Sequence, residues 1–160
     1  MIQRIQTVFL FLVGVCMILF LIFPVWELNH PETGELYKLY SIYMIHRPAG
    51  SEISEYFCYP YSISGGLALI SIILAFVEIL KYKNRLTQVK IGMFNALIIV
   101  ASLILLVVLI YFDQIELMPE VRGRYLPGLY MPAAALVFNS LANRFIRRDE
   151  KLVRSVDRIR

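Results

Sequence analysis

The sequence is poor in the residues that most catalytic and metal-binding sites need. It contains only two cysteines and two histidines. Cys16 lies deep within an apolar run and Cys58 ends a polar loop, so the two are too far apart for a disulfide, whose Cα atoms lie within about 7 Å of each other. No Cys-x-x-Cys pair and no zincin, phosphate-loop or Ser/His/Asp pattern is present. We therefore expect a non-catalytic protein that uses no metal or other cofactor.

Charge is also scarce over long stretches of the chain. Apolar residues make up 59% of the sequence, above the roughly 45 to 50% that is usual in soluble domains. Four runs are long enough to cross about 30 Å of hydrocarbon, at residues 8–25, 61–80, 91–112 and about 126–143. Glu78 is the only charged residue in them. The sequence therefore predicts an all-α membrane protein, a single domain built as a four-transmembrane-helix bundle.

The basic residues gather in segments that flank one end of these runs. The turn at residues 81–90 has four cations and no acid, and together with the N-terminus and the tail it brings twelve of the sixteen Lys and Arg residues to one side. The two outer loops hold only four cations, and the first also holds five glutamates. Because short loops rich in Lys and Arg stay in the cytoplasm, we predict that both termini are cytoplasmic. The excess of basic residues thus indicates the orientation of the chain in the membrane, and no nucleic-acid partner is expected.

The loop at residues 27–60 is the longest polar segment and has room for structure outside the membrane. Residues 25–28 and 35–43 are rich in β-forming side chains and flank a turn-forming cluster at residues 29–34. We expect a small β-hairpin or a three-stranded cap over the outer end of the bundle. His30 and His46 lie in this cap, where further metal ligands at defined spacing are missing, so we interpret both as solvated.

Small residues recur at helical spacing in the second and fourth runs. In the second run they are Ser64, Ala68, Ser71 and Ala75, and in the fourth the stripe consists of Pro132, Ala135, Asn139 and Ala142. Small side chains let helix backbones approach closely in lipid. Since both runs cross from outside to inside, we predict that these two faces meet as a near-parallel pair of helices.

Four polar residues within the runs fall near the inner side of the membrane. They are Glu78, Asn95, Asn139 and Asn143. An ionisable residue inside a membrane is a functional hypothesis by default, and this cluster could bind an ion, a proton or a lipid headgroup. The alternative is structural: Glu78 reaches the interface and pairs with Lys81 or Arg144, while the asparagines bridge helices.

The tail at residues 144–160 has apolar residues at helical spacing between many cations. It predicts a basic amphipathic helix that continues from the fourth run, with Glu150 and Arg154 as a favourable pair four residues apart. One interpretation is an interfacial anchor on anionic lipid. The other is a docking element for a partner, with Glu150, Arg154, Asp157 and Arg158 as contact residues, because a pure lipid anchor would gain by omitting acids.

Two end motifs resemble a known family. The opening Met-Ile-Gln-Arg-Ile-Gln-Thr at residues 1–7 and the closing Asp-Glu-Lys-Leu-Val-Arg-Ser-Val-Asp-Arg-Ile-Arg at residues 149–160 are similar to those of an uncharacterised four-span inner-membrane family of Bacteroidota, a domain of unknown function. The resemblance covers the whole length. It implies a multi-pass protein of the bacterial inner membrane and brings no activity, cofactor or catalytic residue.

Two classes of function remain after these exclusions. The first is a non-catalytic scaffold or accessory subunit of an envelope complex, which would contact the lipid bilayer and other membrane or envelope proteins. The alternative is a small transporter or lipid-handling protein that uses the inner polar cluster. Only Ser71 and Ser102 are polar near the centre of the runs, and a path for substrate across the membrane would need more polar side chains there. The sequence therefore favours the scaffold.

Overall fold

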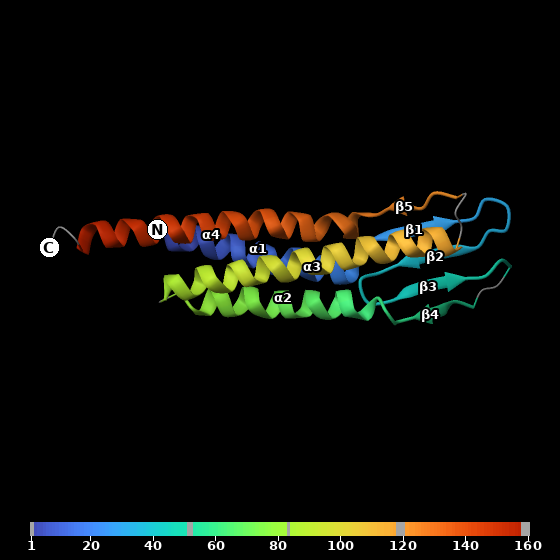
Figure 1. The fold of residues 1–160 in the computed structure, drawn as a ribbon, viewed down its shortest axis with the longest axis horizontal. Helices are drawn as coiled ribbons and strands as arrows, with labels where there is room; N and C mark the ends of the chain where they lie inside the picture. The colour runs from blue at the N-terminus through green and yellow to red at the C-terminus, as the bar shows by residue number, and fades with distance from the viewer. Residues whose placement is uncertain (1, 51–52, 83, 118–120, 158–160) are drawn as a thin grey trace.

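The computed structural model describes residues 2–50, 53–82, 84–117 and 121–157, and the side chains of residues 5–153 within these ranges. Four helices run side by side, with a small sheet at one end (Figure 1). They are α1 (Ile2–Ile22), α2 (Ser62–Leu80), α3 (Arg85–Leu117) and α4 (Tyr130–Asp157). The chain alternates direction, because α1 and α3 run toward the sheet whereas α2 and α4 run away from it (Figure 1).

The apolar runs of the sequence form the first three helices. In each of α1, α2 and α3, length and composition suffice to cross a membrane. The fourth predicted run is different: α4 begins at Tyr130 but continues into the charged tail, and by length and composition it is not among the helices that qualify. The half of α4 nearer the sheet also carries Pro132, Asn139 and Asn143, which lower the apolar content of the helix. The structure thus supports a mostly helical membrane protein with three such helices.

The four helices form a ring in which consecutive helices are neighbours. The close pairs are α1 with α2, α2 with α3, α3 with α4, and α4 with α1. The prediction that the second and fourth helices form a packed pair is wrong, since α2 and α4 lie diagonally across the bundle. The physical reason is connectivity: in an alternating bundle each helix packs against antiparallel neighbours, so two parallel helices are placed on a diagonal.

An antiparallel sheet covers the end of the bundle where α1 finishes. Its strand order is β4-β3-β2-β1-β5. The strands are β1 (Trp26–Asn29), β2 (Leu36–Leu39), β3 (Met44–Arg47), β4 (Glu55–Phe57) and β5 (Arg124–Tyr125). The predicted hairpin is present as β1 and β2, with Trp26 opposite Leu39. Gly34 in its turn has φ of +75°, a left-handed conformation that glycine adopts without strain.

The sheet is larger than the predicted cap because two loops build it. β5 comes from the segment between α3 and α4 and pairs with β1, placing Tyr125 opposite Trp26. A Cβ atom at Gly123 would overlap the indole of Trp26, so the chain lies directly on that ring. The backbone N–H of Gly123 also donates to Oε1 of Gln114 at 2.8 Å, and the side-chain amide of Gln114 donates to the carbonyl of Val121. The end of α3 therefore holds β5 against the sheet.

Candidate functional site

The predicted polar residues of three helices converge on Gly92 of α3, near the end of the bundle opposite the sheet. The side-chain amide of Asn139 in α4 donates to the carbonyl of Gly92 at 2.8 Å. A Cβ atom at Gly92 would lie 2.7 Å from Oε1 of Glu78 in α2 and 2.6 Å from Oδ1 of Asn143 in α4. The carboxylate and the two amides thus meet where a glycine leaves space for them. We call Glu78, Asn95, Asn139 and Asn143 the inner polar cluster.

Asn95 lies one turn further along the same face of α3. It is fully buried, and neither its amide nitrogen nor its amide oxygen has a hydrogen-bond partner among the described residues. The amide oxygens of Asn139 and Asn143 are in the same situation within this part of the chain. Polar groups buried without partners cost about 1 to 3 kcal/mol each. The inner polar cluster therefore has unused hydrogen-bonding capacity in the structure.

Glu78 is the most unusual member of the cluster. Its exposed fraction is 0%, and neither carboxylate oxygen has a hydrogen-bond partner among the residues that the structure describes. Lys81, one turn on, is exposed, and within the described residues no salt bridge joins Glu78 to a cation. The pairing of Glu78 with Lys81 or Arg144 that the structural alternative expects is not among the salt bridges of the described residues, whereas Asn139 bridges α4 and α3 as that alternative expects. A buried carboxylate without a partner is costly, and an ionisable residue in such a position is a candidate functional residue.

Two further residues of this region were not predicted from the sequence. Gln88 in α3 is buried, and its amide donates to the backbone carbonyl of Glu78 at 2.8 Å. Gly92 provides the space in which the cluster meets. Both share a stripe with Asn95, Ile99 and Ser102, all buried in α3. The helical periodicity that marks the small residues of α2 and α4 would have identified this stripe as well.

The predicted helix-packing residues all point into the bundle. Ser64, Ala68, Ser71, Ala75, Ala135 and Ala142 are buried, each with an exposed fraction of 0 or 1%. Ser64 contributes one interhelical contact, since its hydroxyl donates to the carbonyl of Ser102 at 3.4 Å. Although α2 and α4 are not neighbours, their small residues line the interior that all four helices share.

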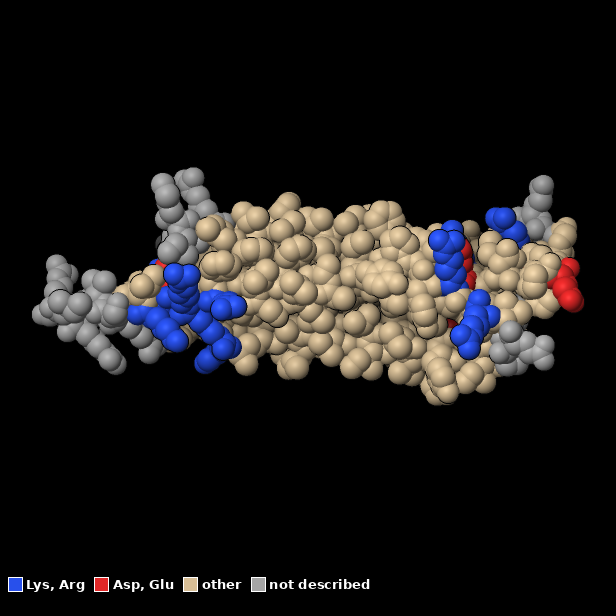
Figure 2. Space-filling model, turned by 90° about the horizontal axis from the view of Figure 1, so that it is seen from above, with Lys and Arg blue, Asp and Glu red and all other residues tan. Residues whose placement is uncertain are grey.

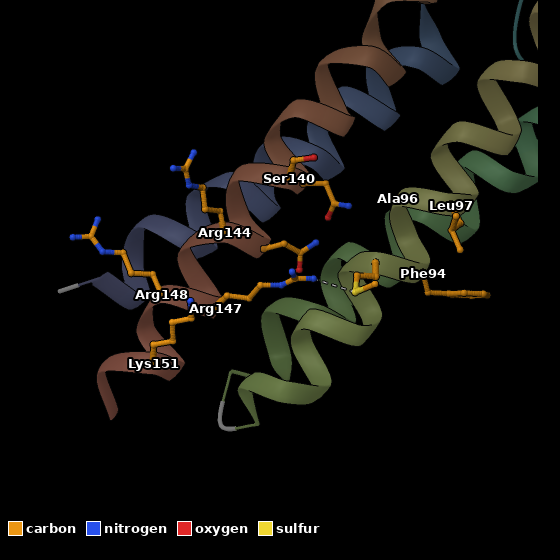
Figure 3. A pocket seen from close by; sticks show the side chains of 11 residues that line it. Phe94, Ala96, Leu97, Ser140, Arg144, Arg147, Arg148 and Lys151 are labelled. Carbon is orange, nitrogen blue, oxygen red and sulfur yellow. Dashed lines mark hydrogen bonds between the residues drawn. The ribbon is translucent and has the colours of Figure 1, made fainter. Parts of the chain in front are cut away.

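A groove between α3 and α4 adjoins the inner polar cluster (Figure 3). Its volume is about 920 Å³. Met93, Phe94 and Leu97 of α3 form an apolar wall, and Asn139 and Asn143 belong to both the groove and the cluster. The buried polar groups therefore lie behind a surface that opens to the outside of the bundle.

Four cations line the same groove from α4. They are Arg144, Arg147, Arg148 and Lys151. Their spacing of three, one and three residues places them on one side of the helix. Arg147 reaches toward α3, where its guanidinium donates to the sulfur of Met93 at 3.2 Å, whereas Arg144 and Arg148 fan out from α4 (Figure 3). Lys and Arg side chains gather at this end of the molecule, and a broad band without charge separates them from the charged residues at the sheet end (Figure 2).

The beginning of the tail is part of the bundle. Asp149 of α4 forms a salt bridge with Arg85 of α3 at 3.0 Å, and Ile146 is fully buried. Of the predicted docking residues, Glu150 is half-buried. Arg154 and Asp157 belong to α4, but their side chains lie outside the described part, and Arg158 lies outside the described residues altogether. The predicted pairing of Glu150 with Arg154 is therefore not part of what the structure describes.

The sheet carries a second group of polar and aromatic residues. The His46 ring stacks on Tyr37 with ring centroids 4.3 Å apart, and Nδ1 of His46 lies 3.5 Å from a carboxylate oxygen of Glu55. Burial, followed by the nearby charges of Glu35 and Glu55, raises the pKa of the Tyr37 phenol above its ordinary value. Among the described residues, no group of three His, Cys, Asp or Glu side chains could hold a metal ion.

The fold and the site define a mostly helical protein with three helices apolar enough to cross a membrane, a sheet at one end, and a polar cluster with a basic groove at the other. The chain belongs to the family described as Domain of unknown function (DUF4293), whose model matches residues 2–159. No curated protein matches the sequence. The family description assigns no activity, so the function has to be argued from the structure.

Proposed function

We propose that the protein is a four-span protein of the bacterial inner membrane with both termini in the cytoplasm. Three helices qualify as spans, and α4 packs against two of them, α1 and α3, over the shared bundle. The basic residues at the end of α4, the uncharged band and the mixed charges near the sheet follow the order of a cytoplasmic interface, a hydrocarbon core and an outer interface (Figure 2). In this orientation the sheet is the outer cap.

Within the membrane the protein acts as a non-catalytic scaffold or accessory subunit of an envelope complex. The observation that carries this proposal is the length of α4, which extends past the ends of the other three helices at the basic end (Figure 1). The sheet extends from the opposite end (Figure 1). The bundle thus presents one surface on each side of the bilayer, and the projecting part of α4 is a docking element for a partner protein.

A stop after Val153 tests the docking role of α4. The salt bridge between Arg85 and Asp149 stays intact in this variant, which a stop after Arg148 would break. We expect the truncated protein to insert and fold normally but to lose the proteins that co-purify with the full chain in a mild detergent. Co-purification followed by mass spectrometry measures this. Replacement of residues 154–160 by a Gly/Ser segment of equal length is the matched control for chain length, and it should also lose the partners.

Two results would oppose the docking role. If the truncated protein retained the same partners, the tail would be an interfacial anchor. If the truncated protein failed to insert, the tail would be needed for folding.

A second function, a small transporter or lipid-handling protein, is favoured by one observation: the buried carboxylate of Glu78, which has no partner among the described residues. If Glu78 is kept for ligand binding, it costs stability, because a buried carboxylate without compensation is unfavourable. Glu78→Gln retains the shape and removes the ionisable group. We expect it to raise the stability of the fold by about 1 to 3 kcal/mol.

Thermal unfolding in detergent measures this effect. Glu116→Gln is the matched control, because Glu116 is an exposed acid of α3 whose replacement should change stability by no more than about 0.5 kcal/mol. If Glu78→Gln lowered the unfolding midpoint, the carboxylate would be a stabilising element and the second function would lose its support.

A further inference from the structure

The groove between α3 and α4 combines an apolar surface with a cationic one. Phe94 and Leu97 are 57% and 67% exposed and form its apolar wall. The contact between Arg147 and Met93 shows which part of α3 lies beside the cations of α4. From Met93, Leu97 lies about 6 Å further toward the sheet, at a rise of about 1.5 Å per residue. At the same rise, Arg144 of α4 lies about 4.5 Å nearer the sheet than Arg147, so the apolar wall of α3 lies beside the cations of α4.

The charge of the groove has one sign. None of the described residues that line it is acidic. Of the two acids that adjoin these cations in sequence, Asp149 is bound to Arg85 at 3.0 Å, and neither Asp149 nor Glu150 lines the groove. Guanidinium groups bind phosphate through two parallel hydrogen bonds, so a pair of arginines near an interface suits a phosphate group well.

We propose that this groove is a binding site for an anionic phospholipid. The phosphate is held by the cations that line the groove from α4, with Arg147 on the side nearer α3, and one acyl chain lies along Phe94 and Leu97 of α3. This occupant matches the groove in both charge and polarity, because it carries a negative headgroup for the cations and an apolar tail for the exposed side chains of α3. The site is separate from the docking role of the projecting end of α4, and it requires only that the bundle lies in a membrane.

The charge of the groove adds a preference among headgroups. The four cations that line it from α4 attract a headgroup with net negative charge and repel a quaternary amine. Phosphatidylglycerol, whose phosphate is its only charged group, therefore fits better than a lipid whose headgroup ends in a quaternary amine.

Native mass spectrometry of the full chain in detergent tests the site directly. Phosphatidylglycerol and phosphatidylcholine with the same acyl chains are titrated separately into the protein. We expect phosphatidylglycerol adducts to form at about tenfold lower lipid concentration, since each basic group near a lipid surface contributes about 1 kcal/mol. Because detergent leaves both ends of the bundle accessible, this measurement does not depend on the orientation in the membrane or on any partner protein.

Two variants separate the groove from the general basic surface. Arg144→Gln with Arg148→Gln should weaken phosphatidylglycerol binding about thirtyfold, since two basic groups are lost. Lys81→Gln with Lys90→Gln removes two exposed cations from the same end, outside the groove, and should change binding less than about threefold. Ser140→Trp fills the groove without changing charge and should also weaken binding. Its control is Val137→Trp, because Val137 is 58% exposed on α4 and does not line the groove.

Several outcomes would overturn the proposal. Equal binding of the two lipids, or equal losses in the two charge variants, would show non-specific attraction to a basic surface. Unchanged binding in Ser140→Trp together with loss in Val137→Trp would place the lipid elsewhere on α4. An adduct with inorganic phosphate that forms as readily as the phosphatidylglycerol adduct would show a site for a free anion, in which the apolar wall has no part.

Discussion

At the scale of single residues, glycines mark the points where the backbone segments come closest. Gly128 begins the approach of α4 to the end of α1, and its N–H donates to the carbonyl of Pro24 at 3.1 Å. A Cβ atom at Gly128 would lie 2.6 Å from the carbonyl oxygen of Phe23, closer than such contacts permit. Since both neighbours are backbone atoms, they cannot move aside as a side chain could. This junction fixes the position at which α4 begins. It therefore also fixes the position of the cations further along α4.

Gly128→Ala should therefore destabilise the protein. We expect a loss of about 1 to 3 kcal/mol, the usual cost of adding bulk to a packed site, measured as a lower thermal unfolding midpoint in detergent. Gly66→Ala is the matched control, because a Cβ atom at Gly66 would meet nothing within 4 Å and alanine favours a helix by about 1 kcal/mol. Equal midpoints for the two variants would show that the junction tolerates a side chain.

The individual polar residues were the easiest part of the site to predict. Glu78, Asn95, Asn139 and Asn143 stand out because polar residues are rare in apolar runs. What the sequence could not show was their environment. The burial of Glu78 and the space at Gly92 depend on how α2, α3 and α4 pack together. That packing joins residues far apart in the chain, so a local sequence pattern does not predict it.

At the scale of helices and strands, the small residues of α2 and α4 allow the bundle to be narrow. Ala68 and Ala135 have exposed fractions of 0% and lie on the faces that point inward. Ala68→Leu and Ala135→Leu should each lower the stability by about 1 to 3 kcal/mol, because a larger side chain has no space there. Thermal unfolding in detergent measures the loss, and Ala133→Leu, on the exposed side of α4, should leave the midpoint nearly unchanged. Midpoints like that of the unaltered chain in both buried variants would contradict the packing role.

The elements differ in how far local sequence specifies them. The hairpin of β1 and β2 was predictable, because its strands alternate around a turn with Gly34 in the left-handed region. β5 was not, since Arg124 and Tyr125 carry little strand signal and pair only because the end of α3 holds their loop against β1. The mistaken pairing of α2 with α4 had the same origin: similar stripes indicate which faces are buried, but the connections decide which helices are neighbours.

At the scale of the whole molecule, the distribution of charge and the direction of the helices specify an orientation. Residues 81–90 and the end of α4 are basic and lie together, far from the sheet (Figures 1 and 2). In the proposed topology this end faces the cytoplasm and the sheet faces outward. The orientation decides which surface could meet a cytoplasmic partner and in which leaflet the groove between α3 and α4 would find its lipid.

The two native cysteines allow this orientation to be tested with few changes. Cys58 is exposed beside the sheet, whereas Cys16 is buried in α1. In intact cells a membrane-impermeant maleimide should label Cys58, and Cys58→Ser alone should remove the labelling. Adding Asn84→Cys to that variant places a thiol in the exposed turn between α2 and α3. This thiol should react only after the inner membrane is opened, because the turn is held in the cytoplasm by its cations. Labelling of Asn84→Cys in intact cells, or of Cys58 only after opening, would reverse the orientation and place the groove in the outer leaflet.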